Sequence, residues 1–162
     1  PLVMLLGWLS GTVSGSGESN AWYAELVKPE AQPPGWVFAL VWPILYLLTG
    51  IALAIVLNAR GAALRMLGVG LFLLQFLLNL AWSPVFFGRH EVTTAAYLIV
   101  VILVLAVGTT LVFGRIRATA AWLMVPYLAW LSFATILAWQ IDGLNPEAES
   151  LYIPAATAPI GN

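Results

Sequence analysis

Two side-chain amides stand inside one of the most apolar stretches of the chain. Gln75 and Asn79 share a helical face with Trp82 and Phe86, because the four residues follow the spacing i, i+4, i+7 and i+11. An amide is costly in hydrocarbon unless it meets a hydrogen-bonding partner. We therefore expect this face to point into a helix bundle or at a cavity.

Aromatic side chains recur at helical spacing in two other apolar segments. Their members are Tyr127, Trp130, Ala134 and Leu137 in one stripe and Phe38, Trp42 and Tyr46 in the other, where Pro43 is expected to bend the helix. Such stripes are often plain core, and Trp or Tyr near the end of a span is often an interfacial anchor. Here the rings of three segments fall at matching depths beside the two amides. This pattern favours a ring-lined cavity for a large, flat, mostly apolar ligand.

The connection before these segments carries unusual chemistry for so apolar a chain. It reads "WYAELVKPEAQPPGWVF" from Trp22 to Phe38, and its prolines restrict the backbone to few shapes. The stretch "SNAWYAEL" can form a short helix capped by Ser19 or Asn20. The sequence predicts a stiff flap over the cavity.

Several side chains of this flap could take part in binding. Trp22 or Tyr23 is expected in the roof of the cavity. Lys28 could pair with a ligand carboxylate, although a lipid phosphate or Glu25 is the favoured partner.

The composition indicates which elements must position these residues. Hydrophobic residues make up 62% of the 162 residues and charged residues 8%, whereas a soluble domain carries about 25% charged residues. Four charge-free runs each reach the roughly 20 residues that cross a bilayer as a helix, and a fifth from Leu2 to about Gly17 is shorter. Because the fifth run lacks a basic n-region, we interpret it as a helix and not as a signal peptide.

The expected fold is therefore all-α, an integral membrane bundle of five transmembrane helices. The helices are predicted at about 1–17, 36–57, 62–88, 92–114 and 117–141 within one domain, 1–142, with a lid loop at 18–35 and an extended C-terminal tail at 143–162. Gly7, Gly11 and Gly15 predict close packing of the first helix. A glycine-lined cavity wall is the alternative for this face.

Charged residues divide cleanly between the two ends of such a bundle. One end receives four arginines and no acid (Arg60, Arg65, Arg115 and Arg117), and the other receives all seven acids with Lys28 and Arg89 (Glu18, Glu25, Glu30, Glu91, Asp142, Glu147 and Glu149). By the positive-inside rule the N-terminus is expected to be cytoplasmic, with the lid loop and the C-terminus on the opposite side.

Several kinds of chemistry are disfavoured by what the sequence lacks. It contains no cysteine, no basic run for nucleic acid and no Asp, Glu, Lys or Arg within the five apolar runs, where a proton-coupled transporter normally has one. No metal site and no hydrolytic constellation is predicted, and His90 lies in a turn. Any enzyme here would depend on aromatic redox chemistry or photochemistry, for which Trp42 is the candidate catalytic residue.

Three motifs resemble those of the TspO/MBR family, which includes bacterial tryptophan-rich sensory proteins and the mitochondrial translocator protein, or peripheral benzodiazepine receptor. They are "WYAELVKPEAQPPGWVFALVWPILYLLTG", "QFLLNLAWSPVFFG" and "PYLAWLSFATIL", and the likeness extends from about Gly7 to Asp142. The resemblance implies a five-helix bundle, usually homodimeric in the lipid bilayer, that binds porphyrins such as protoporphyrin IX. The resemblance also implies that the protein requires no cofactor and that the ligand lies under the first loop.

The resemblance also implies roles for particular residues. The family pocket includes positions matching Trp42, Asn79, Trp82, Tyr127, Trp130, Ala134 and Leu137. It implies tetrapyrrole transport or regulation or, as the alternative, light- and oxygen-dependent degradation of protoporphyrin IX involving Trp42. A purely structural or partner-recruiting membrane protein is a third hypothesis.

One family feature is missing. Animal members carry a cholesterol-recognition motif with a tyrosine and a downstream arginine. This chain has Trp139 and Gly143 at those two positions, so cholesterol binding is in doubt. This difference, together with the missing targeting signal, favours a bacterial membrane.

Overall fold

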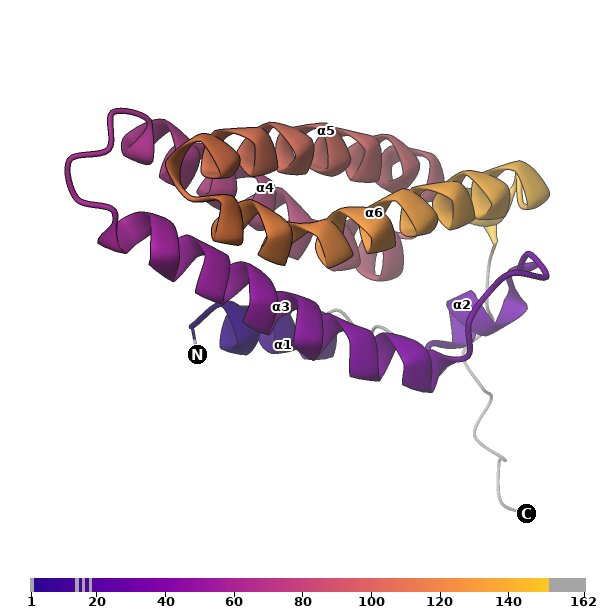
Figure 1. The fold of residues 1–162 in the computed structure, drawn as a ribbon. Helices are drawn as coiled ribbons and strands as arrows, with labels where there is room; N and C mark the ends of the chain where they lie inside the picture. Colours follow the sequence, from indigo (N-terminus) through magenta and orange to yellow (C-terminus); the bar gives the residue numbers. More distant parts are fainter. Residues whose placement is uncertain (1, 14, 16, 18, 152–162) are drawn as a thin grey trace, which may run out of the picture.

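The computed structural model describes residues 2–13, 15, 17 and 19–151, and these are helical without strands (Figure 1). The elements in chain order are α1 (Leu2–Val13), α2 (Ala21–Glu25), α3 (Gly35–Asn58), α4 (Arg65–Ser83), the π-helix η1 (Pro84–Gly88), α5 (Val92–Ile116), α6 (Ala118–Leu144) and the 3₁₀-helix η2 (Ala148–Ser150). The predicted all-α class is confirmed.

The prediction of five spanning helices is wrong within the described residues, because four helices are long and apolar enough to cross a membrane. They are Gly35–Asn58, Arg65–Gly88, Val92–Ile116 and Ala118–Leu144. Helix α1 has 12 residues and is not among these four helices. It stops at Val13 because Gly15 and Gly17 follow with φ of 60° and 125°, a backbone that breaks a helix.

The long helices form a bundle in which sequence neighbours pack side by side. Helix α5 packs on α4 and α6, α3 packs on α6, and α1 lies against α3 and α4 (Figure 1). Helix α3 begins directly after Pro33 and Pro34, because a residue that precedes proline is disfavoured in helical conformation.

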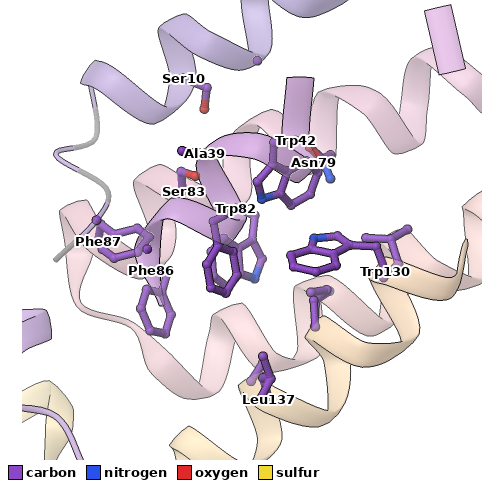
Figure 2. Close-up of a pocket in the computed structure, with 18 of the residues that line it drawn as sticks. Ser10, Ala39, Trp42, Asn79, Trp82, Ser83, Phe86, Phe87, Trp130 and Leu137 are labelled. Carbon is purple, nitrogen blue, oxygen red and sulfur yellow. The ribbon is translucent and has the colours of Figure 1, made fainter. Parts of the chain in front are cut away.

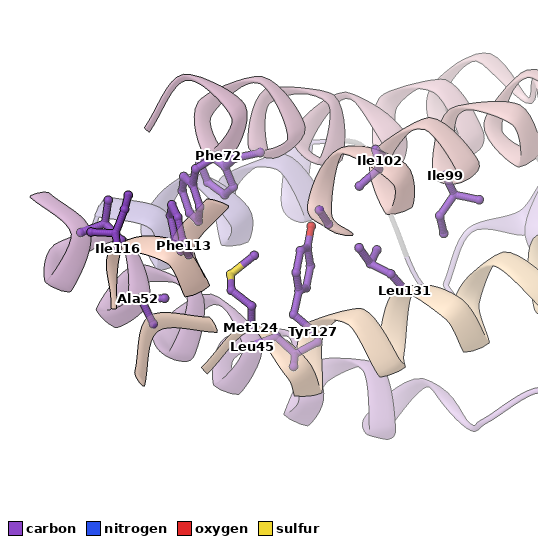
Figure 3. Close-up of a cluster of buried hydrophobic side chains, with 14 of the residues drawn as sticks. Leu45, Ala52, Phe72, Ile99, Ile102, Phe113, Ile116, Met124, Tyr127 and Leu131 are labelled. Carbon is purple, nitrogen blue, oxygen red and sulfur yellow. The ribbon is translucent and has the colours of Figure 1, made fainter. Parts of the chain in front are cut away.

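Apolar side chains fill the bundle toward the end where α3 joins α4 and α5 joins α6. The rings of Phe72 and Phe113 stack with centroids 6.1 Å apart, and Met124 and Tyr127 continue the core along α6 (Figure 3). Gly68 permits this approach, because a Cβ there would already lie 3.2 Å from the Phe113 ring. This dense core leaves the other half of the bundle to hold the cavity.

The outer surface of the bundle is also apolar. Met66, Val104, Leu111 and Trp122 are examples of large side chains that are mostly exposed. Such a surface is unfavourable in water and suits acyl chains. The exposed apolar residues therefore agree with the membrane class that the composition predicts.

The C-terminal region differs from the predicted extended tail at its start. Helix α6 continues to Leu144, and Ala148 in η2 is 2% exposed because it packs in a cluster with Trp22 and Leu26. Residues 152–162 of the predicted tail lie outside the described residues.

Candidate ligand-binding site

A cavity of about 830 Å³ opens between α1, the connection 19–34, α3, α4 with η1, α5 and α6 (Figure 2). We call this connection the lid. Most of the residues predicted to bind a ligand line the cavity: Tyr23, Phe38, Trp42, Tyr46, Asn79, Trp82, Phe86, Trp130, Ala134 and Leu137. Trp22 and Tyr127 do not line it, although both contact residues that do.

The α4 wall is shaped by a proline. Pro84 has no N–H, and the chain continues as a π-helix through Gly88. The wider turn brings both Phe86 and Phe87 to the cavity, which regular helical spacing does not do for adjacent residues. Trp82 stacks on Phe86 with centroids 4.9 Å apart, and its Nε1 donates to the Ala95 carbonyl at 3.0 Å. The Trp82 ring is thus fixed in place by α5.

The α3 wall contributes two further rings. Trp42 and Tyr46 lie one turn apart with centroids at 5.3 Å, and both face the cavity. Pro43 deprives the Ala39 carbonyl of its helical donor, and both residues also line the cavity. This wall therefore combines flat apolar rings with a backbone acceptor.

The predicted amide face points into the bundle and makes one hydrogen-bonded chain. Tyr46 Oη donates to Asn79 Oδ1 at 2.8 Å, Asn79 Nδ2 donates to Tyr127 Oη at 3.2 Å, and Tyr127 Oη donates to Gln75 Oε1 at 2.7 Å. Gln75 is 1% exposed and Asn79 is 7% exposed, so each amide is buried with partners. The network ties α3, α4 and α6 together behind the cavity and holds the Tyr46 ring.

The α6 wall is centred on Trp130. Its indole projects into the cavity region toward Trp42 and Trp82 (Figure 2), and Phe38 packs edge-on against it at 5.4 Å. Trp130 Nε1 is buried and has no hydrogen-bond partner among the described residues. It is therefore an unused donor beside the cavity.

The lid closes the cavity with Tyr23, Lys28 and Gln32. Of the two predicted caps for α2, the structure selects Asn20, whose Oδ1 accepts from Tyr23 N at 3.1 Å. The Tyr23 ring packs edge-on against Phe87 at 5.3 Å.

Lys28 stabilises the lid itself. Its Nζ donates to the Tyr23 carbonyl at 2.8 Å and lies 4.5 Å above the Tyr23 ring. The structure gives Lys28 backbone carbonyls of the lid as partners, whereas the sequence favoured Glu25 or a lipid phosphate.

Trp22 anchors the lid from behind. Its Nε1 donates to the Ala148 carbonyl at 3.0 Å, and its ring stacks on His90 at 4.3 Å. Val27 and Asn145 exchange two hydrogen bonds of 2.8 Å between the Val27 backbone and the Asn145 side chain. The lid is thus fastened to the end of α6.

Phe87 and Gln32 are among the cavity residues that the sequence reasoning missed. Phe87 was missed because regular helical spacing places it away from Phe86, and Pro84 was the signal for the change of pitch. Gln32, whose Nε2 donates to Tyr23 Oη at 2.9 Å, carries no periodic signal in a loop.

Comparison with known proteins identifies relatives across nearly the whole chain. A model of the TspO/MBR family matches residues 1–144. The tryptophan-rich protein TspO of Chlorobaculum tepidum is 43% identical over 126 residues, which are 77% of this chain and 80% of that protein. The translocator protein of Homo sapiens is 37% identical over 134 residues, 82% and 79% of the two chains. The tryptophan-rich sensory protein of Cereibacter sphaeroides is 35% identical over 134 residues, 81% and 83% of the two.

Proposed function

Because this chain belongs to the TspO/MBR family, we propose that it is a membrane receptor or sensor for porphyrins such as protoporphyrin IX. The ligand occupies the cavity under the lid, and binding serves the transport or regulation of tetrapyrroles. No cofactor is required.

The observation that carries this proposal is the convergence of flat rings on one cavity. Trp42, Trp82 and Trp130 come from three different helices, and Tyr23 covers them from the lid. The volume of about 830 Å³ falls within the roughly 300–1,000 Å³ of small-molecule sites. Planar ligands gain apolar contact and stacking energy against such walls. Plain core packing would not leave this space open.

A thermal-shift titration in detergent tests the proposal. A ligand that binds only the folded protein stabilises it by about 2.7 kcal/mol at a concentration of 100 Kd. We expect protoporphyrin IX to raise the melting temperature in a saturable manner, and a sterol of similar mass to serve as the comparison ligand. An unchanged melting temperature at every porphyrin concentration would support the structural, partner-recruiting alternative.

The position of Trp42 supports a second candidate function, the light- and oxygen-dependent degradation of protoporphyrin IX. The ring lines the cavity beside Tyr46, where it would touch a bound macrocycle. On this hypothesis the porphyrin absorption spectrum changes under illumination in air, and Trp42→Phe abolishes the change. A time course equal to that of detergent alone would reject the enzymatic role while leaving the receptor role intact.

We also propose the orientation and assembly of the receptor. The arginines at the end where α3 joins α4 and α5 joins α6 favour a cytoplasmic location for that end, in a bacterial membrane. The lid then faces the opposite side, and two copies form a homodimer. Cysteine labelling at Ala62 and Gly143 with a membrane-impermeant reagent would distinguish the two ends.

A further inference from the structure

Two residues of helix α1 make close contacts with the cavity walls. Gly7 lies directly against the ring of Tyr46 on α3, and Ser10 Oγ donates to the Leu80 carbonyl on α4 at 2.6 Å. Both Gly7 and Ser10 also line the cavity. The Ser10 bond connects residues 70 positions apart.

The acceptor of this bond is a carbonyl that α4 cannot satisfy by itself. In an α-helix the N–H four residues later donates to each carbonyl, and the residue four positions after Leu80 is Pro84. Proline has no N–H, so the Leu80 carbonyl loses its regular donor. Water is scarce in the hydrocarbon region, and an unsatisfied carbonyl is costly there. The Ser10 hydroxyl supplies the missing donor.

This carbonyl lies in the turn that carries the cavity rings of α4. Trp82 follows Leu80 by two residues, and the π-helix that presents Phe86 begins at Pro84. The Trp82 indole is fixed on the other side by its bond to the Ala95 carbonyl of α5. The turn is therefore clamped between α1 and α5, with the stacked pair of Trp82 and Phe86 facing the cavity.

We propose that Ser10 is a positioning residue for the cavity: its hydroxyl replaces the donor that Pro84 removes and so fixes the α4 turn that presents Trp82 and Phe86. The inference gives α1 a role in ligand binding. Its consequence for ligand affinity rests on the proposed function, whereas its consequence for stability does not.

A double-mutant cycle tests the clamp directly. Pro84→Ala restores a backbone N–H that can donate to the Leu80 carbonyl, which makes the Ser10 hydroxyl dispensable. We expect Ser10→Ala to lower the melting temperature in the native background and to have little effect in the Pro84→Ala background. Equal losses in the two backgrounds would overturn the proposal.

Ligand affinity and ring geometry supply readouts that general destabilisation does not move. Measured well below the melting temperature, Ser10→Ala should weaken protoporphyrin IX binding by about five- to tenfold, the worth of one lost buried hydrogen bond. The near-ultraviolet circular dichroism of the stacked Trp82 should change in parallel. Ser10→Thr keeps a hydroxyl and should restore both signals.

The matched control is Ser132→Ala. The Ser132 hydroxyl donates to the Leu128 carbonyl of its own helix at 2.9 Å, where the regular helical donor is present. It should change neither melting nor binding. If Pro84→Ala does not fold, an unaltered spectrum and melting temperature in Ser10→Ala would still refute the clamp. If wild-type protein binds no porphyrin, the receptor proposal fails and the stability cycle alone decides the role of Ser10.

Discussion

The contact between Gly7 and Tyr46 yields a sharp prediction for the packing of α1. A Cβ added to Gly7 would overlap the Tyr46 ring, with two further ring atoms at 2.6 Å. Ordinary carbon contacts are about 3.5–4.0 Å, so Gly7→Ala must displace the ring or the helix by roughly 1 Å. The ring cannot swing away freely, because Tyr46 Oη is bonded to Asn79 at 2.8 Å.

Overpacking of this kind costs about 1–3 kcal/mol, which lowers the melting temperature of a chain of this size by about 2–4 °C per kcal/mol. The matched control is Gly70→Ala on α4, where a Cβ would meet nothing within 4 Å. That exchange should stabilise by about 0.5–1 kcal/mol through helix propensity. Thermal unfolding of both variants in one detergent provides the comparison. A Gly7→Ala protein that melts at or above Gly70→Ala would refute the packing described for α1.

Two further predictions concern the buried network and the lid fastening. Tyr127→Phe removes the shared partner of Asn79 and Gln75 and leaves buried polar groups unpaired, so it should destabilise by about 1–3 kcal/mol. Tyr97→Phe, at a mostly exposed ring, should have little effect, and equal melting of the two variants would contradict the network. Asn145→Asp places an oxygen opposite the Val27 carbonyl in place of the donor; we expect faster dissociation of bound porphyrin in stopped-flow measurements, whereas Asn58→Asp should leave the rate unchanged. A dissociation rate that Asn145→Asp does not alter would show that this fastening does not retain the ligand.

Local sequence patterns were sufficient to predict the long helices and the faces that meet. The length of the apolar runs predicted helices α3 to α6. Helical spacing placed Trp42, Asn79 and Trp130 on faces that do meet around one cavity. Together with membership of the TspO/MBR family, the four apolar helices make this chain a multi-pass integral membrane protein.

The features that sequence patterns missed depend on pitch, on glycine conformation or on long-range contacts. Helix α1 ends early because Gly15 takes a positive φ, which residue type permits but does not require. Trp22 does not line the cavity because its indole donates to the Ala148 carbonyl, 126 residues away. The burial of Ala148 follows from the same contact, which helical periodicity cannot reveal.

The central claim is that a porphyrin binds among the rings of α3, α4 and α6. The most direct measurement is the Kd for protoporphyrin IX, obtained from saturable fluorescence quenching, in wild type, Trp130→Ala and Trp122→Ala. Trp122 is 74% exposed and lies outside the cavity, so the two substitutions remove the same chemical group from different places. We predict a Kd at least tenfold higher for Trp130→Ala and an unchanged Kd for Trp122→Ala. Equal constants for all three proteins would contradict binding in this cavity.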